Sequence, residues 1–356
     1  MHKPLALGIL LGTAGLVTLP PVHASERLDV VASFSILADM VENVGGEHVD
    51  VTSLVGPDSD THVFSPSPTH ARALAEADVV VFNGLQFEGW MERLIDSSDY
   101  AGVLVTATDG VRAMDYHGRD QEHAHGHDEH DDDDHGDDHG HDDQEQGHDD
   151  GHDAHGDQDP HAWQDLSLGK LYVANIRDGL IEADPDNADS YRDNAERYIK
   201  ELETTDAEIR ELLGEIPAAS SVVTGHDSFG YFSNAYGVRF LSPAGLSTEV
   251  DPSASDMAQL IDVIRDQDIQ ALFHESMTNP ATIDQLAEET GLPVAGTLYA
   301  DALASDGEAS TYRGMMHHNA EVLHAALAEP GHDADREHGH DDHDDHGHDD
   351  DHGHSH

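Results

Sequence analysis

The sequence predicts an α/β protein made of two small open parallel-sheet lobes joined by one long rigid backbone helix. In two blocks of the chain, short β-branched apolar runs alternate with helix-like segments, which is typical of a parallel sheet covered by helices. A single long amphipathic stretch separates the two blocks. With 356 residues, the chain is long enough for two domains with separate cores.

Residues 1–24 have the composition of a cleavable secretory signal peptide. His2 and Lys3 precede an apolar run from Leu5 to Leu19, and Val22-His23-Ala24 forms a small-residue cleavage site. The apolar run is too short to span a bilayer well, and no later segment resembles a transmembrane helix. We therefore expect a soluble mature chain that begins near Ser25, resides in the periplasm and has no direct membrane insertion.

The composition excludes several classes of protein. There is no cysteine, which excludes a disulfide framework, a thiolate metal site and a lipid-anchoring cysteine. The formal net charge of −58 would repel the phosphates of nucleic acid and of anionic membranes, so neither is an expected partner. Adaptation to a salty habitat and ordinary solubility both fit this acidity.

The first lobe is predicted over residues 25–184. Its expected strands are Leu28–Phe34, Val49–Val55, Asp78–Phe82 and Gly102–Thr106, with helices such as Ile36–Val44 and Pro68–Ala77 between them. Residues 117–158 are almost entirely His, Asp, Gly, Glu and Gln and contain eleven histidines. This segment has no apolar surface to offset the entropy of ordering, so we expect a disordered loop.

The linking backbone helix is predicted over residues 185–214. Asp184 can serve as its N-cap and Pro185 as its first residue, and Gly214 ends it. Apolar positions recur every three or four residues along one stripe, at Ala188, Tyr191, Ala195, Tyr198, Leu202, Thr205, Ile209 and Leu212. We expect a rigid strut along the back of both lobes. A two-chain coiled coil is the alternative, but the stripe is poor in leucine.

The second lobe is predicted over residues 215–329 and repeats the pattern of the first. Its expected strands are Ser221–Thr224, Val238–Leu241, Ile269–Phe273 and Pro293–Leu298, and its expected helices include Ser253–Asp266, Pro280–Thr290 and Tyr312–Ala328. The tail, residues 330–356, returns to a His- and Asp-rich composition with nine histidines and is expected to be disordered.

Four residues stand out as candidate metal ligands. His62 and His161 lie in turns bounded by prolines, His226 follows a β-branched strand, and Asp301 lies just past another strand. Open parallel sheets bind ligands beyond the carboxyl ends of their strands, so the four are expected to face the gap between the lobes. Three imidazoles and one carboxylate suit tetrahedral Zn²⁺ better than Mg²⁺ or Ca²⁺, which prefer oxygen.

These residues lie in motifs that resemble a known family. The motifs are Thr61–Pro68, Asp159–Trp163, Thr224–Phe232, Tyr299–Leu303 and Tyr312–Asn319. They resemble the cluster A-I metal-binding periplasmic substrate-binding proteins of ABC importers, and specifically the zinc-uptake, ZnuA-like branch. The resemblance covers nearly all of the chain from Arg27 to Ala328.

The resemblance implies two α/β lobes on one long helix, with metal held by His62, His161, His226 and Asp301. The manganese branch typically has a glutamate where this chain has His226, so the histidine favours zinc. Zn²⁺ is then the transported ligand, and an ABC transporter permease with its ATPase is the partner. A periplasmic zinc chaperone is a further candidate partner, and the chain is expected to be a monomer. The alternatives are a manganese- or iron-binding member of the same family and a His-rich extracytoplasmic metal buffer or adhesin.

An enzyme is not expected. A hydrolytic zinc site keeps an open position, usually with three protein ligands and a nearby carboxylate base. Here four ligands are available, and no nucleophile motif or phosphate loop accompanies them. Asp227 is expected to orient the neighbouring ligand, and Glu275 is expected to make structural or outer-sphere hydrogen bonds.

Because the long helix limits hinge closure, metal binding is expected to move local loops more than whole lobes.

Overall fold

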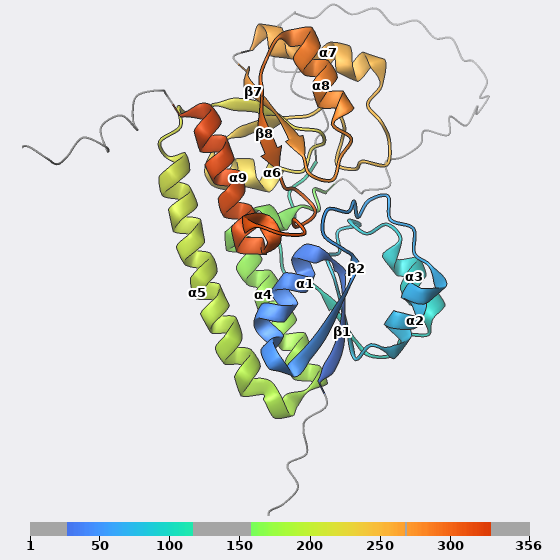
Figure 1. Cartoon of the computed structure of the whole chain (residues 1–356). Coiled ribbons are helices and arrows are strands. Elements are labelled where there is room, and N and C mark those ends of the chain that lie inside the picture. Colours follow the sequence, from blue (N-terminus) through green and yellow to red (C-terminus); the bar gives the residue numbers. More distant parts are fainter. Residues whose placement is uncertain (1–26, 117–157, 268, 329–356) are drawn as a thin grey trace, which may run out of the picture.

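The computed structural model describes residues 27–116, 158–267 and 269–328, which form two α/β lobes stacked along one long helix (Figure 1). The predicted fold class is confirmed. The expected signal peptide, the tail and the histidine-rich tract as far as residue 157 lie outside the described residues. Among the described residues, no helix combines the length and the apolar character needed to cross a membrane.

The N-terminal sheet has four parallel strands in the order β2-β1-β3-β4. They are β1 (Leu28–Phe34), β2 (Val49–Val55), β3 (Val79–Phe82) and β4 (Val103–Thr106). The helices of this lobe are α1 (Ser35–Gly45), α2 (Pro68–Glu76), α3 (Met91–Ser98) and α4 (Leu166–Ala183). The last five residues of β1 are buried in succession, as expected of a central strand covered on both faces.

The C-terminal sheet repeats this connectivity, with parallel strands in the order β6-β5-β7-β8. They are β5 (Ser221–Val223), β6 (Arg239–Leu241), β7 (Ile269–Glu275) and β8 (Val294–Leu298). The helices are α6 (Gly230–Tyr236), α7 (Ala254–Asp266), α8 (Ala281–Thr290) and α9 (Tyr312–Leu327). Short 3₁₀ turns occur at η1 (Gly46–His48), η3 (Ala162–Gln164), η4 (Pro185–Asn187) and η5 (Glu308–Ser310).

The long helix α5 (Ala188–Leu213) runs beside both lobes (Figure 1). It begins later than predicted, because residues 185–187 form the 3₁₀ turn η4. Its buried stripe is Tyr191, Ala195, Tyr198, Leu202, Thr205, Ile209 and Leu213, so Leu213 takes the place predicted for Leu212. The helix packs on α1 and α4 of the first lobe and on α6 and α9 of the second. It therefore supports both lobes, as expected from the sequence.

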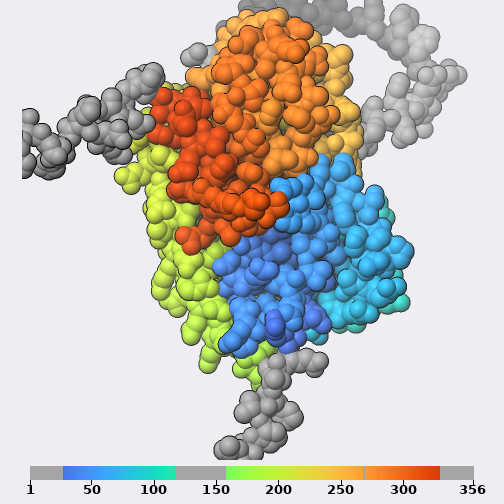
Figure 2. Space-filling model, in the orientation of Figure 1, coloured from blue at the N-terminus to red at the C-terminus, as the bar shows by residue number. Residues whose placement is uncertain are grey.

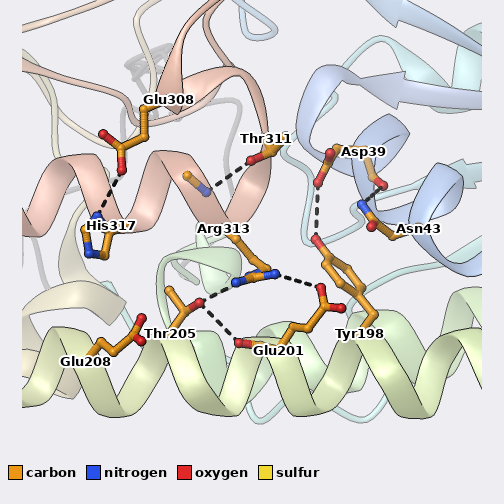
Figure 3. Close-up of a pocket in the computed structure, with 11 residues that line it drawn as sticks. Asp39, Asn43, Tyr198, Glu201, Thr205, Glu208, Glu308, Thr311, Arg313 and His317 are labelled. Atoms are coloured by element: carbon orange, nitrogen blue, oxygen red, sulfur yellow. Dashed lines mark hydrogen bonds and ion pairs between the residues drawn. The ribbon is translucent and has the colours of Figure 1, made fainter.

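Polar contacts fix α5 to both lobes. The Tyr198 hydroxyl donates to Asp39 Oδ2 of α1 at 3.2 Å. Arg313 of α9 donates from Nη1 to Glu201 Oε2 at 2.7 Å and from Nε to Thr205 Oγ1 at 3.2 Å. These side chains line a pocket of about 490 Å³. Figure 3 shows them between α5, α9 and α1. Helix α5 is therefore hydrogen-bonded to one helix from each lobe, α1 and α9.

The two lobes share a core, which differs from the separate cores expected from the chain length. One buried cluster includes Val30 of β1, Tyr198 of α5, Phe273 of β7 and Leu323 of α9. A smaller cluster lies under α7 and α8. The shared core arises because α5 and α9 bury apolar side chains against both lobes, which lie in broad contact in Figure 2. The domain boundaries placed at residues 184 and 214 stay predictions.

Candidate metal centre

The structure brings all four predicted ligand residues together. His62 follows β2, His161 precedes η3, His226 follows β5 and Asp301 follows β8. All four are at most 3% exposed. Each offers one ligand atom, and these atoms lie within 4.8 Å of one another. The site lies at the carboxyl ends of both sheets, where they face each other.

Asp301 is the centre of the group. Its Oδ2 lies 3.2 Å from His62 Nε2 and 3.0 Å from His226 Nε2, and its Oδ1 lies 3.7 Å from His161 Nε2. Among the described residues, His161 Nε2 and Asp301 Oδ1 are buried without a hydrogen-bond partner. Unsatisfied buried polar atoms are costly, and a bound cation would satisfy both. The donor set thus fits a divalent transition-metal ion.

Two carboxylates outside the predicted ligand set orient the imidazoles. Glu275 Oε2 lies 2.5 Å from His226 Nδ1, while its Oε1 accepts the N–H groups of Gly225 and His226 at 2.7 and 3.0 Å. Asp159 Oδ1 lies 2.8 Å from His161 Nδ1 and accepts the His161 N–H at 2.9 Å. A proton on each Nδ1 leaves the Nε2 lone pair facing the centre, as metal binding requires.

The role of Glu275 matches the outer-sphere hydrogen bonding expected from the sequence. The role of Asp159 was missed, although its position two residues before His161 allows it to accept that residue's own N–H. The backbone N–H of Asp227 donates to Gly245 O at 2.9 Å. Glu275 is therefore the carboxylate that orients His226, the role that the sequence suggested for Asp227.

Both tryptophans of the chain border the site. The Trp163 ring lies 5.3 Å from the His161 ring, and its Nε1 donates to Ala300 O at 2.9 Å. Trp90 Nε1 donates to Thr61 O at 2.9 Å, next to the first ligand. The Trp163 ring therefore covers one side of the His161 ring. Both rings are buried.

The buried charges favour a protonated His226 in the metal-free site. Burial alone would lower the pKa of His226, but the carboxylates of Glu275 and Asp301 raise this pKa well above its usual value. Burial alone would raise the pKa of Asp301, but His226 and His161 hold it well below its usual value. Burial lowers the pKa of His62, despite the opposing effect of Asp301. An incoming dication must therefore displace a proton from His226.

Two other described histidines pair with carboxylates away from the four candidate ligands. His274 pairs with Asp284 at 2.9 Å and His324 with Glu215 at 3.0 Å. Glu308, His317 and Glu321 also bring ligand atoms within 4.8 Å of one another, but these side chains are 33–52% exposed. Such exposed groups occur commonly without an ion.

Two α/β lobes on one helix, with a buried cluster of three histidines and an aspartate between them, define a metal-binding protein of the two-lobed substrate-binding class. The family model "Zinc-uptake complex component A periplasmic" matches residues 30–326, and the chain belongs to this family. Substrate-binding proteins of this family work with ABC permease and ATPase components; they are not enzymes.

The chain is 32% identical over 323 residues to the manganese-binding lipoprotein MntA of Bacillus subtilis, covering 85% of this chain and 91% of the relative. It is 27% identical over 321 residues to the iron-binding protein YfeA of Yersinia pestis, covering 89% and 92%. The solved structure of the periplasmic zinc binding protein TroA from Treponema pallidum superposes with a TM-score of 0.71 at 25% identity, covering 85% and 99%.

The family expected from the sequence is therefore confirmed, whereas the zinc branch is not. Similar curated relatives carry the names of manganese- or iron-binding proteins. These names support the alternative cargo named from the sequence better than they support zinc.

Proposed function

We propose that this chain captures a divalent transition-metal ion outside the cytoplasm and delivers it to the permease of an ABC-type importer. The ion is held between the lobes by His62, His161, His226 and Asp301. The observation that carries the proposal is the convergence of these four buried side chains, among which His161 Nε2 and Asp301 Oδ1 have no hydrogen-bond partner within the described residues. Four ligands enclose the ion and leave no open position for chemistry.

Manganese or iron is the cargo that the relatives support best, because similar curated proteins are named for these metals. Zinc is the second candidate. It is favoured by the donor set, since three nitrogens and one oxygen suit Zn²⁺ better than a harder ion. Zn²⁺ generally binds a given site more tightly than Mn²⁺ or Fe²⁺, so affinity alone does not identify the cargo. Uptake must be measured.

The site is tested by titrating the full chain with Mn²⁺ and Zn²⁺ while following tryptophan fluorescence. Both tryptophans border the site, so the signal reports the cleft. We expect His62→Ala to weaken binding by about 100-fold or more, because it removes a direct ligand. His324→Ala, which alters a histidine on the surface of α9, should bind like the wild type. Wild-type affinity in His62→Ala would refute the assignment.

The cargo is tested in cells that lack the chain. Loss of manganese or iron accumulation, restored by the wild type but not by His62→Ala, would support the first candidate, and loss of zinc accumulation the second. Deleting both histidine-rich tracts separates an importer component, which should keep one tight site, from a metal buffer, which should lose its capacity. The monomeric state, periplasmic location and delivery by a zinc chaperone stay predictions.

A further inference from the structure

A strained turn of the first lobe lies against two of the proposed ligands. Residues 83–90, called the strained turn below, join β3 to α3. Gly84, Leu85 and Gln86 have positive φ angles of 89°, 51° and 60°, and the Phe87 N–H closes the turn by donating to Gly84 O at 3.1 Å. Residues other than glycine rarely adopt such a backbone in succession. Strain of this kind persists only where surrounding contacts enforce it, and it is concentrated at functional sites.

Side chains of the strained turn contact the ligand loops. The centre of the Phe87 ring lies 4.9 Å from that of the His62 ring and 5.8 Å from that of the His161 ring, with the planes at 76° and 75°. Phe87 is fully buried. Asn83 Nδ2 donates to Pro160 O at 3.0 Å, directly before His161. The strained turn therefore contacts both imidazoles of the first lobe and also the backbone that precedes one of them.

A buried carboxylate holds the strained turn. Glu88 is 5% exposed. Its Oε1 accepts the Ser33 hydroxyl at 2.5 Å and the Asn83 N–H at 2.7 Å, and its Oε2 accepts the Gly84 N–H at 3.3 Å. Burial raises the pKa of this carboxyl, although these hydrogen bonds oppose the rise. Burying a carboxylate is costly unless donors surround it, and here the donors include two backbone N–H groups at the start of the strained turn.

Other hydrogen bonds also hold the start of this turn. Asn83 O accepts from the backbone N–H and the hydroxyl of Thr108, at 3.2 and 2.6 Å. The Tyr172 hydroxyl of α4 donates to Asn83 Oδ1 at 2.7 Å. Because these bonds remain when the carboxylate of Glu88 is removed, its loss should loosen the strained turn without unfolding the lobe.

We propose that Glu88 is a positioning residue for metal capture. Its carboxylate holds the strained turn in its left-handed conformation, and this conformation sets the spacing of the His62 and His161 rings. Phe87 packs on both rings, and Asn83 fixes the backbone before His161. Rings that are held in place before the ion arrives need not be ordered on binding, so the affinity is higher. The inference rests on the proposed function.

Two substitutions separate this role from a general loss of structure. Glu88→Gln keeps the size of the side chain but replaces one acceptor oxygen with an NH₂ group, which cannot accept a backbone N–H. We expect it to weaken Co²⁺ binding about tenfold, as removal of an outer partner of a metal ligand can do. Leu85→Gly relieves strain, because glycine adopts positive φ freely. Adding Leu85→Gly to Glu88→Gln should therefore recover most of the lost affinity.

The test titrates the full chain with Co²⁺ and follows the first equivalent by quenching of tryptophan fluorescence and by visible absorption. The d–d bands of bound Co²⁺ report the geometry of its ligands, and they should change in Glu88→Gln and return in the double variant. Urea unfolding of each metal-free variant measures the accompanying loss of stability. A structural role alone would lower stability without changing the spectrum of the bound ion.

The matched control is Asp184→Asn, which also converts a hydrogen-bonded carboxylate of the first lobe into an amide. Asp184 Oδ2 accepts the Tyr191 hydroxyl at 2.9 Å and Asn187 Nδ2 at 2.6 Å. It lies in the connection between α4 and α5, at the end of the first lobe remote from the second (Figure 1). This variant should lose stability and bind Co²⁺ like the wild type.

Wild-type affinity and absorption in Glu88→Gln would overturn the positioning role, and so would a loss that Leu85→Gly does not recover. Phe87→Leu leaves Glu88 in place and removes only the ring, so it should also weaken binding. Wild-type affinity in Phe87→Leu would reject the role of the strained turn even if Glu88→Gln did not fold. His62→Ala tests the site itself. If this variant binds the first Co²⁺ as tightly as the wild type, the proposed function fails together with the inference.

Discussion

The protonation of His226 governs how readily the site accepts a metal. Its ring lies between the carboxylates of Glu275 and Asp301, at 2.5 and 3.0 Å, and these raise its pKa well above the usual value despite burial. Near pH 7 the metal-free protein therefore carries a proton on this ring. Binding requires the neutral ring, so affinity should rise as pH rises towards the raised pKa of His226 and fall as pH decreases.

We therefore predict that the first equivalent of Mn²⁺ or Zn²⁺ releases about one proton at pH 7. Calorimetry in two buffers of different ionisation enthalpy measures this number. Glu275→Gln removes a carboxylate beside His226, which should lower the pKa of the ring and reduce proton release. It should also weaken metal binding by about 10–100-fold, since glutamine keeps one acceptor oxygen for the ring and the two backbone N–H groups that Glu275 serves with two. A buffer-independent binding heat in the wild type would contradict the prediction.

The convergence of the four candidate ligands could be predicted from the sequence, whereas the groups that orient them could not all be predicted. His62, His161, His226 and Asp301 each follow a recognisable strand or turn, so their convergence can be inferred from the ends of parallel strands. Asp60 accepts the N–H of His62 through Oδ1 and the Thr248 hydroxyl through Oδ2, at 2.9 and 2.6 Å. This second contact cannot be inferred in this way, because Thr248 lies 188 residues further along the chain. That pairing depends on how a loop of one lobe packs on the other.

At the scale of elements, the contact of α4 with α9 supports one wall of the site. A Cβ atom added to Gly169 would lie 2.6 Å from Tyr312 Oη and 3.2 Å from its Cε1. The Tyr312 hydroxyl donates to Trp163 O, and the Trp163 ring packs beside His161. Little room therefore exists for a larger residue at position 169.

We predict that Gly169→Ala destabilises the protein by about 1–3 kcal/mol through overpacking, which outweighs the gain of about 1 kcal/mol in helix propensity. Urea unfolding of the metal-free chain measures the change. Gly56→Ala is the matched control, because a Cβ added there meets nothing within 4 Å, and its stability should change little. Equal stability of Gly169→Ala and the wild type would show that Tyr312 moves aside freely.

Most strands were predicted to within a residue or two of their ends, because short β-branched runs bounded by turns are a strong signal. Helix α4 was not predicted. Gly169, Asn175 and Gly179 weaken its helical pattern, and Gly169 and Gly179 are buried. A Cβ at Gly179 would lie 2.2 Å from Val105 of β4, so this glycine allows close packing of helix on sheet. Tertiary packing therefore overrides local propensity here.

Over the whole molecule, the length of the chain suggested two separate cores, whereas the structure has one main core that crosses the boundary between the lobes. The difference arises from α5 and α9, which each contact elements of both lobes. Their amphipathic stripes predict burial but do not reveal that one stripe packs on two sheets. The shared core and α5 oppose a rotation of whole lobes, and the local loop movement expected from the sequence stays a prediction.

Charge acts on the whole molecule as well. With 74 acidic and 16 basic residues, the chain has a net charge of −58. In the compact state the negatively charged side chains repel one another, and together they attract dications from solution. Isolated surface ion pairs contribute only about 0–1 kcal/mol each, so repulsion should dominate the response to salt. Raising NaCl from 0.1 to 1 M shortens the screening length from about 10 to about 3 Å.

We therefore predict opposite effects of salt on stability and on metal capture. The thermal unfolding midpoint of the metal-free chain should rise between 0.1 and 1 M NaCl, because screening weakens the repulsion. The association rate of Co²⁺, followed by rapid mixing and tryptophan quenching, should fall over the same range, because screening also weakens the attraction of the dication. Sucrose at matched osmolarity controls for solvent effects and should leave the association rate nearly unchanged after correction for viscosity. A midpoint that falls with salt would mean that surface ion pairs outweigh the net charge.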